Sequence, residues 1–390
     1  MDKAILAEMA TDIFLIGKNA TKTDMGSYTV MENDYGKIIK SPEYNSIFRK
    51  KDGNFKRWGK TFEEDPEMAP APEILDIEIT TICHGVPAPN KNNSKEPNKE
   101  SPCAFCYKSN TPNGKNMSFE TFKNVLDKIS EAKVIQQLAF GADSKAESNP
   151  DLWKMADYAR SKGIVPNITV ANITDETADK IVKVMGACAV SRYEDKNLCY
   201  DSAKKLIDRG LSQVNIHILV CEQTYDWIME TLQDRLTDSR LEKLKAVVLL
   251  SLKKRGRGKR FTPLSAEKFK KIVDFAFENN IGIGFDSCSC ARVFKAVENH
   301  PNFDMIVRCG EPCESSLFSS YVDVDGVFMP CSFSPGYAGW DNGISVVNCN
   351  NFISDVWKNE KVEEFRASLL STKTHNKFAC RECPLFDIEG

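Results

Sequence analysis

The cysteines are the residues of this sequence most able to do chemistry. Fourteen occur in 390 residues, and several stand in clusters. In a secreted chain such clusters would predict disulfides. In the cytosol thiols stay reduced, so the clusters there indicate metal or iron–sulfur ligation. Scattered cysteines such as Cys188 and Cys221 lie in apolar runs, which is typical of small buried side chains. The clustered cysteines are therefore the candidate ligands.

The first cluster follows a short β-rich run at 74–80. Cys83 comes directly after this run, and Cys103 and Cys106 form a C-x2-C pair around Ala104 and Phe105. The pair by itself suits zinc or a redox dithiol equally well. A third cysteine at the end of a strand favours three irons of a four-iron cubane, with the fourth iron open to a cofactor.

This arrangement resembles the signature of the radical S-adenosylmethionine superfamily, C-x3-C-x-Φ-C after the first strand. The second half of the motif is present at Ala104, Phe105 and Cys106, but nineteen residues separate Cys83 from Cys103 where three are usual. The insert is polar and Pro-rich, as surface loops are, and the entropy cost of closing a loop grows slowly with its length.

The resemblance implies a 4Fe–4S cluster on Cys83, Cys103 and Cys106, with S-adenosylmethionine bound at the open iron. It also implies cleavage of this cofactor to a 5′-deoxyadenosyl radical, with Phe105 packed near the adenine. The segment 140–144 stands where the family usually has Gly-Gly-Glu-Pro, so Gly141, Ala142 and Asp143 are candidates for the methionine part of the cofactor. The alternative for Asp143 is an ordinary turn at a strand end.

Further candidates lie at the ends of later predicted strands. Ser191 and Arg192 end one strand, and Asn215 and His217 share a face of the next because side chains alternate along a strand. They are candidates for ribose or carboxylate contacts, although a single interior histidine is also a common core residue. The basic run 253–260 is either a surface loop or, at the rim of the barrel, a clamp for a carboxylate or phosphate.

The second cysteine cluster lies at the C-terminus. Cys313 and Cys331 flank an alternating segment that turns at Asp325-Gly326, and Cys380 and Cys383 form another C-x2-C pair. This pattern resembles the SPASM module and its shortened form, twitch, which implies one auxiliary 4Fe–4S cluster on these four cysteines. Zinc is the alternative.

Several cysteines remain outside the two sets. Cys309 or Cys349 could replace one of the auxiliary ligands. Cys288, at the end of the last predicted strand, is the candidate catalytic thiol that would return a hydrogen atom to a substrate in an epimerase. The alternatives for Cys288 are a buried structural thiol and a cluster ligand.

Regular elements must position these residues. Seven β-rich runs alternate with helical stretches, at 74–80, 134–140, 167–172, 187–192, 213–220, 246–252 and 281–286. The helical stretches are 118–131, 150–162, 175–185, 198–209 and 265–278. This alternation predicts an α/β fold, a partial (β/α)6-type TIM barrel with its site at the carboxyl ends of the strands. The expected parts are an N-terminal extension and linker at 1–72, the barrel at 73–300 and a small cluster-stapled module at 301–390.

Composition narrows the function further. The net charge of −3 and pI near 6.0 make nucleic-acid binding unlikely, and no apolar run approaches the roughly 20 residues of a membrane span. We therefore expect a cytoplasmic location. The resemblance to radical S-adenosylmethionine enzymes with a SPASM or twitch module implies an oxidoreductase or peptide-modifying enzyme, with a peptide or a small polar molecule as substrate and a flavodoxin or ferredoxin as electron donor. The alternatives are radical modification of a nucleotide or RNA base, and a zinc-stabilised binding scaffold without catalysis.

Overall fold

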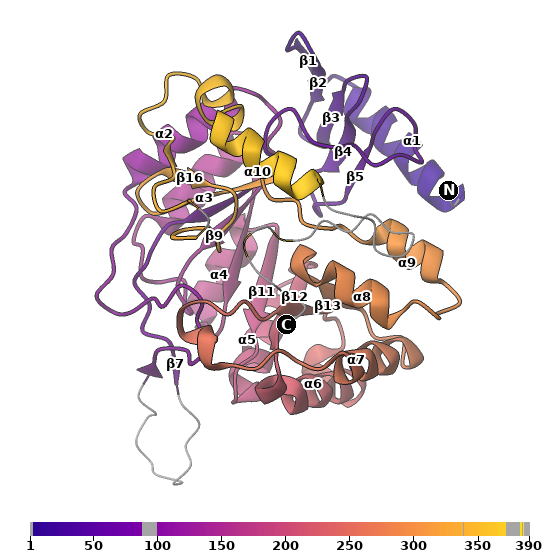
Figure 1. Ribbon diagram of the computed structural model, residues 1–390, viewed down its shortest axis with the longest axis vertical. Coiled ribbons are helices and arrows are strands. Elements are labelled where there is room, and N and C mark those ends of the chain that lie inside the picture. Colours follow the sequence, from indigo (N-terminus) through magenta and orange to yellow (C-terminus); the bar gives the residue numbers. More distant parts are fainter. Residues whose placement is uncertain (1–2, 88–99, 338, 372–382, 384, 386–390) are drawn as a thin grey trace.

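The chain was analysed as a computed structural model that describes residues 3–87, 100–337, 339–371, 383 and 385. Its centre is a β/α repeat, as the alternation of the sequence predicts (Figure 1). Seven parallel strands build it: β6 (Ile74–Glu78), β9 (Gln137–Gly141), β10 (Val165–Val170), β11 (Ala187–Ser191), β12 (Val214–Val220), β13 (Ala246–Ser251) and β14 (Ile283–Phe285). Each overlaps a predicted strand.

Helices connect successive strands. They are α2 (Phe119–Ser130), α3 (Leu152–Ser161), α4 (Asp175–Val184), α5 (Lys196–Asp208), α6 (Tyr225–Thr237) and α7 (Ala266–Glu278). Ser118 and Ser265 are the first residues of two predicted helical stretches, and each hydroxyl caps its helix by accepting a backbone N–H, from Thr121 and Lys268 respectively. Helix α6 was not predicted, because its apolar positions give only a weak amphipathic pattern over its 13 residues.

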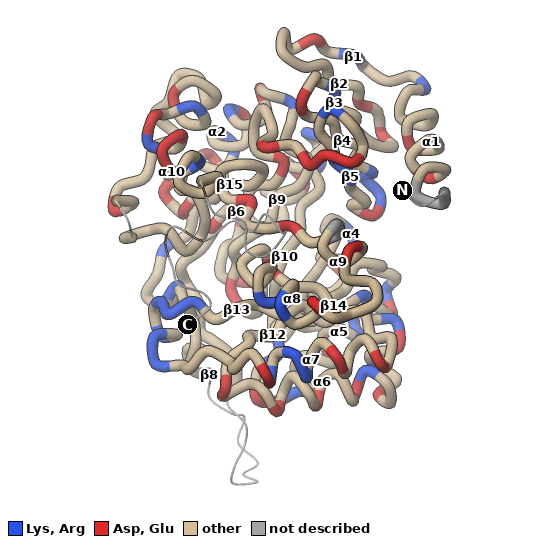
Figure 2. Tube along the Cα trace, turned by 45° about the vertical axis from the view of Figure 1, so that its right-hand side comes forward, with Lys and Arg blue, Asp and Glu red and all other residues tan. Residues whose placement is uncertain are grey.

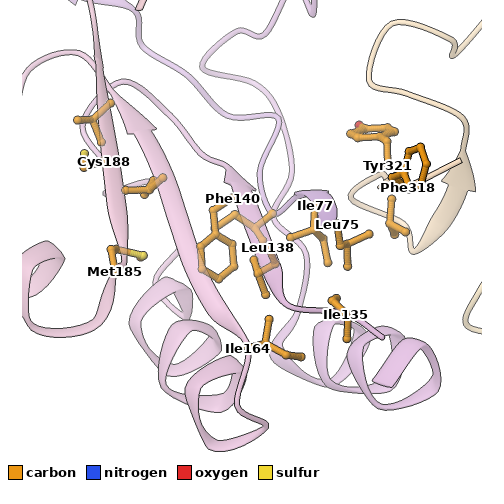
Figure 3. Packing of buried hydrophobic residues seen from close by; sticks show 14 of the residues in the cluster. Leu75, Ile77, Ile135, Leu138, Phe140, Ile164, Met185, Cys188, Phe318 and Tyr321 are labelled. Carbon is orange, nitrogen blue, oxygen red and sulfur yellow. The ribbon is translucent and has the colours of Figure 1, made fainter. Parts of the chain in front are cut away.

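Among the described residues the order of the main sheet is β14-β13-β12-β11-β10-β9-β6-β15-β16-β17, with β14 and β17 at its edges, which agrees with the predicted partial barrel. Apolar side chains between strands and helices form one large core, in which Leu75, Ile77, Leu138 and Phe140 from β6 and β9 lie close together (Figure 3). The core therefore packs against the face of the sheet that the helices cover. The opposite face of the sheet lines the inside of the partial barrel.

The C-terminal region extends the same sheet. Strand β15 (Ser319–Val322) pairs in parallel with β6, and β16 (Val327–Met329) and β17 (Ile344–Ser345) continue from it antiparallel. The predicted hairpin at Asp325-Gly326 is confirmed. Short helices complete this part: α8 (Cys290–Ala296), α9 (Phe303–Cys309), the π-helix Ile353–Trp357 and α10 (Glu360–Leu370).

The N-terminal segment folds, although the sequence predicted no element there. Helix α1 (Lys3–Gly17) packs on an antiparallel sheet of β1 (Thr21–Asp24), β2 (Thr29–Glu32), β3 (Gly36–Lys40), β4 (Asn45–Arg49) and β5 (Phe55–Trp58). Tyr28 and Lys37 donate hydrogen bonds to the carbonyls of Ala132 and Ile135, just before β9 begins. This unit therefore covers the amino ends of the barrel strands, on the side away from the predicted site.

Charge and hydropathy of the described part agree with the composition. Acidic and basic residues are interspersed along the tube without one sign dominating (Figure 2). Within the described residues, no helix has the length and apolarity that a bilayer crossing requires. The 19-residue insert begins and ends in a two-stranded ribbon, β7 (Val86–Pro87) and β8 (Glu100–Ser101).

Candidate functional site

The first three cysteines come together beyond the carboxyl end of β6. The pKa of the Cys103 thiol is raised to about 11, chiefly by burial and in smaller part by charge repulsion from the nearby thiols of Cys83 and Cys106. The backbone N–H of Gly85 points at the Cys83 sulfur, 3.3 Å away, and the Tyr193 hydroxyl contacts Cys103. The thiols therefore share one environment that includes hydrogen-bond donors to sulfur, a feature of iron–sulfur sites.

The loop that carries two of these cysteines is fastened by arginines from across the barrel. Arg257 donates from Nε to the carbonyl of Cys103 (2.8 Å) and from its backbone N–H to that of Cys106 (3.0 Å). Arg260 donates to the carbonyl of Ala104 (2.9 Å). Both belong to the 3-10 segment Gly256–Arg260 that follows β13.

The basic run at 253–260 is therefore not a free surface loop. Arg255, in the same run, donates to the carbonyls of Phe333 and Pro335 in the C-terminal region. In the described part of the chain these arginines take neither of the two predicted roles: they bind backbone carbonyls of the protein itself, and none of their hydrogen bonds goes to a carboxylate. The run of basic residues was recognisable in the sequence, but the backbone carbonyls that its arginines bind could not be predicted from it.

Aromatic rings enclose the cysteine loop. Phe105 stacks on Tyr193 with centroids 5.4 Å apart, and the edge of Phe261 meets it at 5.8 Å. Tyr107 packs on Phe333 of the C-terminal region at 4.3 Å. The analysis of the sequence singled out Phe105 but missed Tyr193 and Phe261, because single aromatic residues after strands have no distinctive spacing.

Gly141, Ala142 and Asp143 stand at the carboxyl end of β9, as predicted. A Cβ at Gly141 would lie 3.2 Å from the Glu78 Cα, so the small residue allows β6 and β9 to approach closely. The buried Asp143 carboxylate accepts backbone N–H groups of Lys145, Glu147 and Ser148 at 2.9–3.1 Å. Its geometry corresponds to the turn-forming alternative, in which the carboxylate organises the following loop.

Ser191, Arg192, Asn215 and His217 lie in adjacent chain segments, since Ser191 pairs with His217 between β11 and β12. Arg192 is buried and binds Glu230 with one nitrogen at 2.7 Å, while its Nε and Nη1 have no hydrogen-bond partner in the described protein. Asn215 and His217 share the face of β12 opposite the core residues Ile216 and Ile218. Burial lowers the pKa of His217 to about 4, so the imidazole is neutral at pH 7.

The second cysteine set surrounds a cavity of about 180 Å³. Cys313, Cys331 and Cys383 line it, each from a different segment of the C-terminal region. The pKa of the Cys331 thiol is raised to about 11, mainly by burial. The backbone N–H groups of Phe333 and Ser334 offset part of this rise. Cys380 lies outside the described residues, as does the side chain of Cys309. Cys349 lies elsewhere, with its carbonyl bound by Lys128 of α2 at 2.7 Å.

Cys288 lines the same cavity, together with Lys253 and Asp286. Lys253 is buried and forms an ion pair with Asp286. Burial lowers the pKa of Lys253, but Asp286 and Cys288 raise it by more, so the net change is upward and the ammonium stays charged. Asp76 of β6 also faces this cavity, where burial raises its pKa to about 6.

Both cysteine sets have the donors of an iron–sulfur cluster. In the described part of the chain, no three His, Cys, Asp or Glu side chains form a group compact enough for a single metal ion. A cubane binds each thiolate at a separate iron, so its ligands stand farther apart than the four ligands of one zinc ion. Cys313, Cys331 and Cys383, which stand around a cavity, therefore fit a cluster.

Comparison with solved structures finds several of similar arrangement. The structure of BtrN in complex with AdoMet and 2-DOIA is similar over 76% of this chain and 87% of that chain, with 13% identity and a TM-score of 0.38. An HpcH/HpaI aldolase from Desulfitobacterium hafniense DCB-2 is similar over 65% of this chain and 87% of that chain, with 7% identity and a TM-score of 0.34. No curated protein matches the chain in sequence.

The family comparison concerns the C-terminal region. Residues 313–384 match the model of the SPASM iron–sulfur cluster-binding domain, and the matched range begins at Cys313 and includes Cys331, Cys380 and Cys383. The iron–sulfur module predicted from these cysteines is thereby confirmed. The C-terminal region of this chain is thus similar to the SPASM iron–sulfur cluster-binding domain over residues 313–384.

Proposed function

We propose that the chain is a radical S-adenosylmethionine enzyme in which Cys83, Cys103 and Cys106 hold a 4Fe–4S cluster with one open iron. The observation that carries the proposal is the convergence of these three thiols at the carboxyl edge of a parallel β/α sheet. Active sites of β/α barrels lie at that edge. When bound, the cluster and S-adenosylmethionine supply a 5′-deoxyadenosyl radical that removes a hydrogen atom from a substrate carbon.

The protein's part is to fix the cysteine loop and to exclude water from it. Arg257 and Arg260 bind the carbonyls of residues 103, 104 and 106, which sets the spacing of the thiols. Phe105, Tyr193 and Phe261 cover the loop with aromatic surface. A dry and rigid surrounding of this kind protects a reactive intermediate from solvent.

We assign the cofactor's carboxylate to Arg192. A buried guanidinium with Nε and Nη1 unpartnered is costly unless acceptors complete its hydrogen bonds, and an anionic carboxylate is a suitable acceptor for one of them. Ser191, Asn215 and the neutral His217 are neighbours suited to the ribose hydroxyls. Gly141 and Ala142 would contact the methionine part through the backbone, and Asp143 would act by folding the loop beside them.

The substrate we propose is a peptide or protein side chain or a small polar metabolite, with oxidation as the net reaction and a flavodoxin or ferredoxin as electron donor. The support for this substrate class is the match of residues 313–384 to the SPASM domain, because the resemblance to SPASM and twitch enzymes implies substrates of this kind. The three functional parts would be 1–72, 73–300 and 301–390. RNA modification is less favoured, because Arg255, Arg257 and Arg260 are bound to protein carbonyls.

Anaerobic reconstitution tests this proposal. The wild-type protein is loaded with iron and sulfide, reduced with dithionite and mixed with S-adenosylmethionine, and 5′-deoxyadenosine and iron are measured. We expect about eight irons per chain, falling to about four in the Cys83→Ala/Cys103→Ala/Cys106→Ala variant, together with complete loss of 5′-deoxyadenosine.

The matched control is Cys188→Ala, which removes a thiol buried in the core and should keep both iron and cleavage. Bound zinc, little iron and no cleavage in the wild type would refute the enzymatic proposal and leave a zinc-stabilised scaffold.

A further inference from the structure

One thiol of the barrel lies where the cluster of the SPASM domain must lie. The cavity of about 180 Å³ is lined by four cysteines, Cys288, Cys313, Cys331 and Cys383. Three of them fall within the matched SPASM range, and Cys288 lies 25 residues before that range begins. The repulsion that the Cys288 thiolate would feel from Cys313 and Cys383 reflects the same proximity.

The barrel holds Cys288 firmly in this position. It lies in the 3-10 turn Ser287–Ser289, directly after β14. The hydroxyls of Ser251 and Ser289 are 2.6 Å apart, and the backbone N–H of Ser251 donates to the Asp286 carboxylate at 3.2 Å. These bonds tie the turn to the end of β13, so the Cys288 side chain is presented to the cavity by two adjacent strands.

The charge of the cavity suits a bound thiolate at this position. Lys253 is buried, pairs with Asp286 and contacts Cys288. A cluster with four thiolate ligands carries net negative charge, and a fixed ammonium next to one ligand offsets part of the cost of burying it. Hydrogen bonds and charges near the sulfurs are among the means by which proteins set cluster potentials.

We propose that Cys288 binds one iron of the auxiliary cluster, completing with Cys313, Cys331 and Cys383 a set of four thiolates that joins the barrel to the SPASM domain. Cys380 lies outside the described residues. This role differs from that of a hydrogen-atom donor, because a donor needs a thiol that is free of iron and directed at a substrate. The inference rests on the iron–sulfur domain at 313–384 and is independent of S-adenosylmethionine chemistry.

Ligation by Cys288 would fix the position of the auxiliary cluster and would also set its charged surroundings. A cluster held only by residues 313–383 would belong to the C-terminal region, whereas a ligand from the end of β14 fixes the cluster relative to the barrel interior. Asp286, which lines the cavity beside Cys288, then lies near both the auxiliary cluster and His217 of β12, whose pKa its charge raises against the larger effect of burial.

The test uses the full-length Cys83→Ala/Cys103→Ala/Cys106→Ala protein, in which only the auxiliary cluster remains. Cys288→Ala, Cys380→Ala and Cys290→Ala are each added, and iron, sulfide and the electron paramagnetic resonance spectrum are measured after anaerobic reconstitution. We expect Cys288→Ala to lower iron from about four per chain to about three or fewer and to change the spectrum. Cys290 is the matched control, since it is buried two residues away against Phe294 and does not line the cavity.

Cys288→Ser distinguishes ligation from folding. A serine oxygen keeps the size of the side chain but is a poor ligand for the cluster, so its spectrum should change while circular dichroism matches that of Cys290→Ser. Unchanged iron and spectra in both Cys288 variants would overturn the proposal. A larger iron loss from Cys380→Ala than from Cys288→Ala would overturn it as well. Neither result would affect cofactor cleavage at the first cysteine set, which the wild-type assay measures separately.

Discussion

The two cysteine sets are built in different ways. The first takes two of its three thiols from the four-residue segment 103–106, and arginines from across the barrel bind the carbonyls of that segment. The second draws its thiols from separate segments that end β14, precede β15, follow β16 and lie near the C-terminus. A site formed by one loop depends on what holds that loop, whereas a site formed by many segments depends on the whole fold around it.

The substitution with the largest expected effect removes the Arg257 side chain, which binds the loop that carries Cys103 and Cys106. Arg257→Ala deletes the donors to Cys103 and Asn110 and should reduce both iron at the first set and the rate of 5′-deoxyadenosine formation by about 10–100-fold, as loss of an outer-sphere partner does. Auxiliary iron should stay at its wild-type level, which the spectra of the two clusters would report separately.

The control is Arg209→Ala, which removes a surface arginine that pairs with Asp175 and Asp179 of α4 and should leave both clusters intact. An equal loss of iron from both sets in Arg257→Ala would contradict the idea that Arg257 serves the first set alone.

A substitution in the hairpin tests the second set. Gly326 has φ of +77°, and a Cβ there would lie 2.5 Å from the Val347 side chain, so Gly326→Ala should lower the free energy of unfolding by about 2 kcal/mol. Auxiliary iron should fall with it, because the hairpin connects Cys313 to Cys331. Chemical denaturation and iron analysis measure both effects.

Gly336→Ala is the matched comparison for this change. Its φ is +78°, but nothing lies within 4 Å of the added Cβ, so only backbone strain of about 1 kcal/mol remains. Equal destabilisation by the two variants would show that packing against Val347 does not hold the hairpin.

The smallest expected effect is on the pH dependence of stability, through the buried His217 on the inner face of β12. Because the pKa of His217 is lowered to about 4 by burial, the unfolded chain binds the proton more tightly than the folded one. The contribution of the neutral His217 to the free energy of unfolding is therefore fully present above about pH 6.5, and it is lost as the pH falls towards 4. Between pH 7 and pH 5 the contribution is on the order of 1 kcal/mol, with allowance for water that reaches the interior.

His217→Gln should flatten this pH dependence when unfolding curves of the two proteins are compared. A slope that is the same in both would mean that the interior is hydrated, and that the space between the two cysteine sets is not the dry environment assumed for radical chemistry.

Much of the scaffold was predictable from local patterns. All seven runs of the barrel became strands, and Ser118 and Ser265 cap the helices they were expected to start. The N-terminal sheet and α6 were missed, because short half-exposed strands and a weakly amphipathic helix lack a clear period. The SPASM domain was recognisable because its cysteines stand at characteristic distances from a glycine turn.

The sequence by itself determined which residues could do chemistry: the cysteines, the aromatic Phe105 and the strand-end positions. Only the tertiary structure decided their partners. It directed Asp143 to loop amides, Arg257 to the carbonyls of the cysteine loop and Cys288 to the auxiliary cavity. Spacing along the chain records local geometry, whereas backbone carbonyls as partners and contacts between distant strands arise only when the sheet folds.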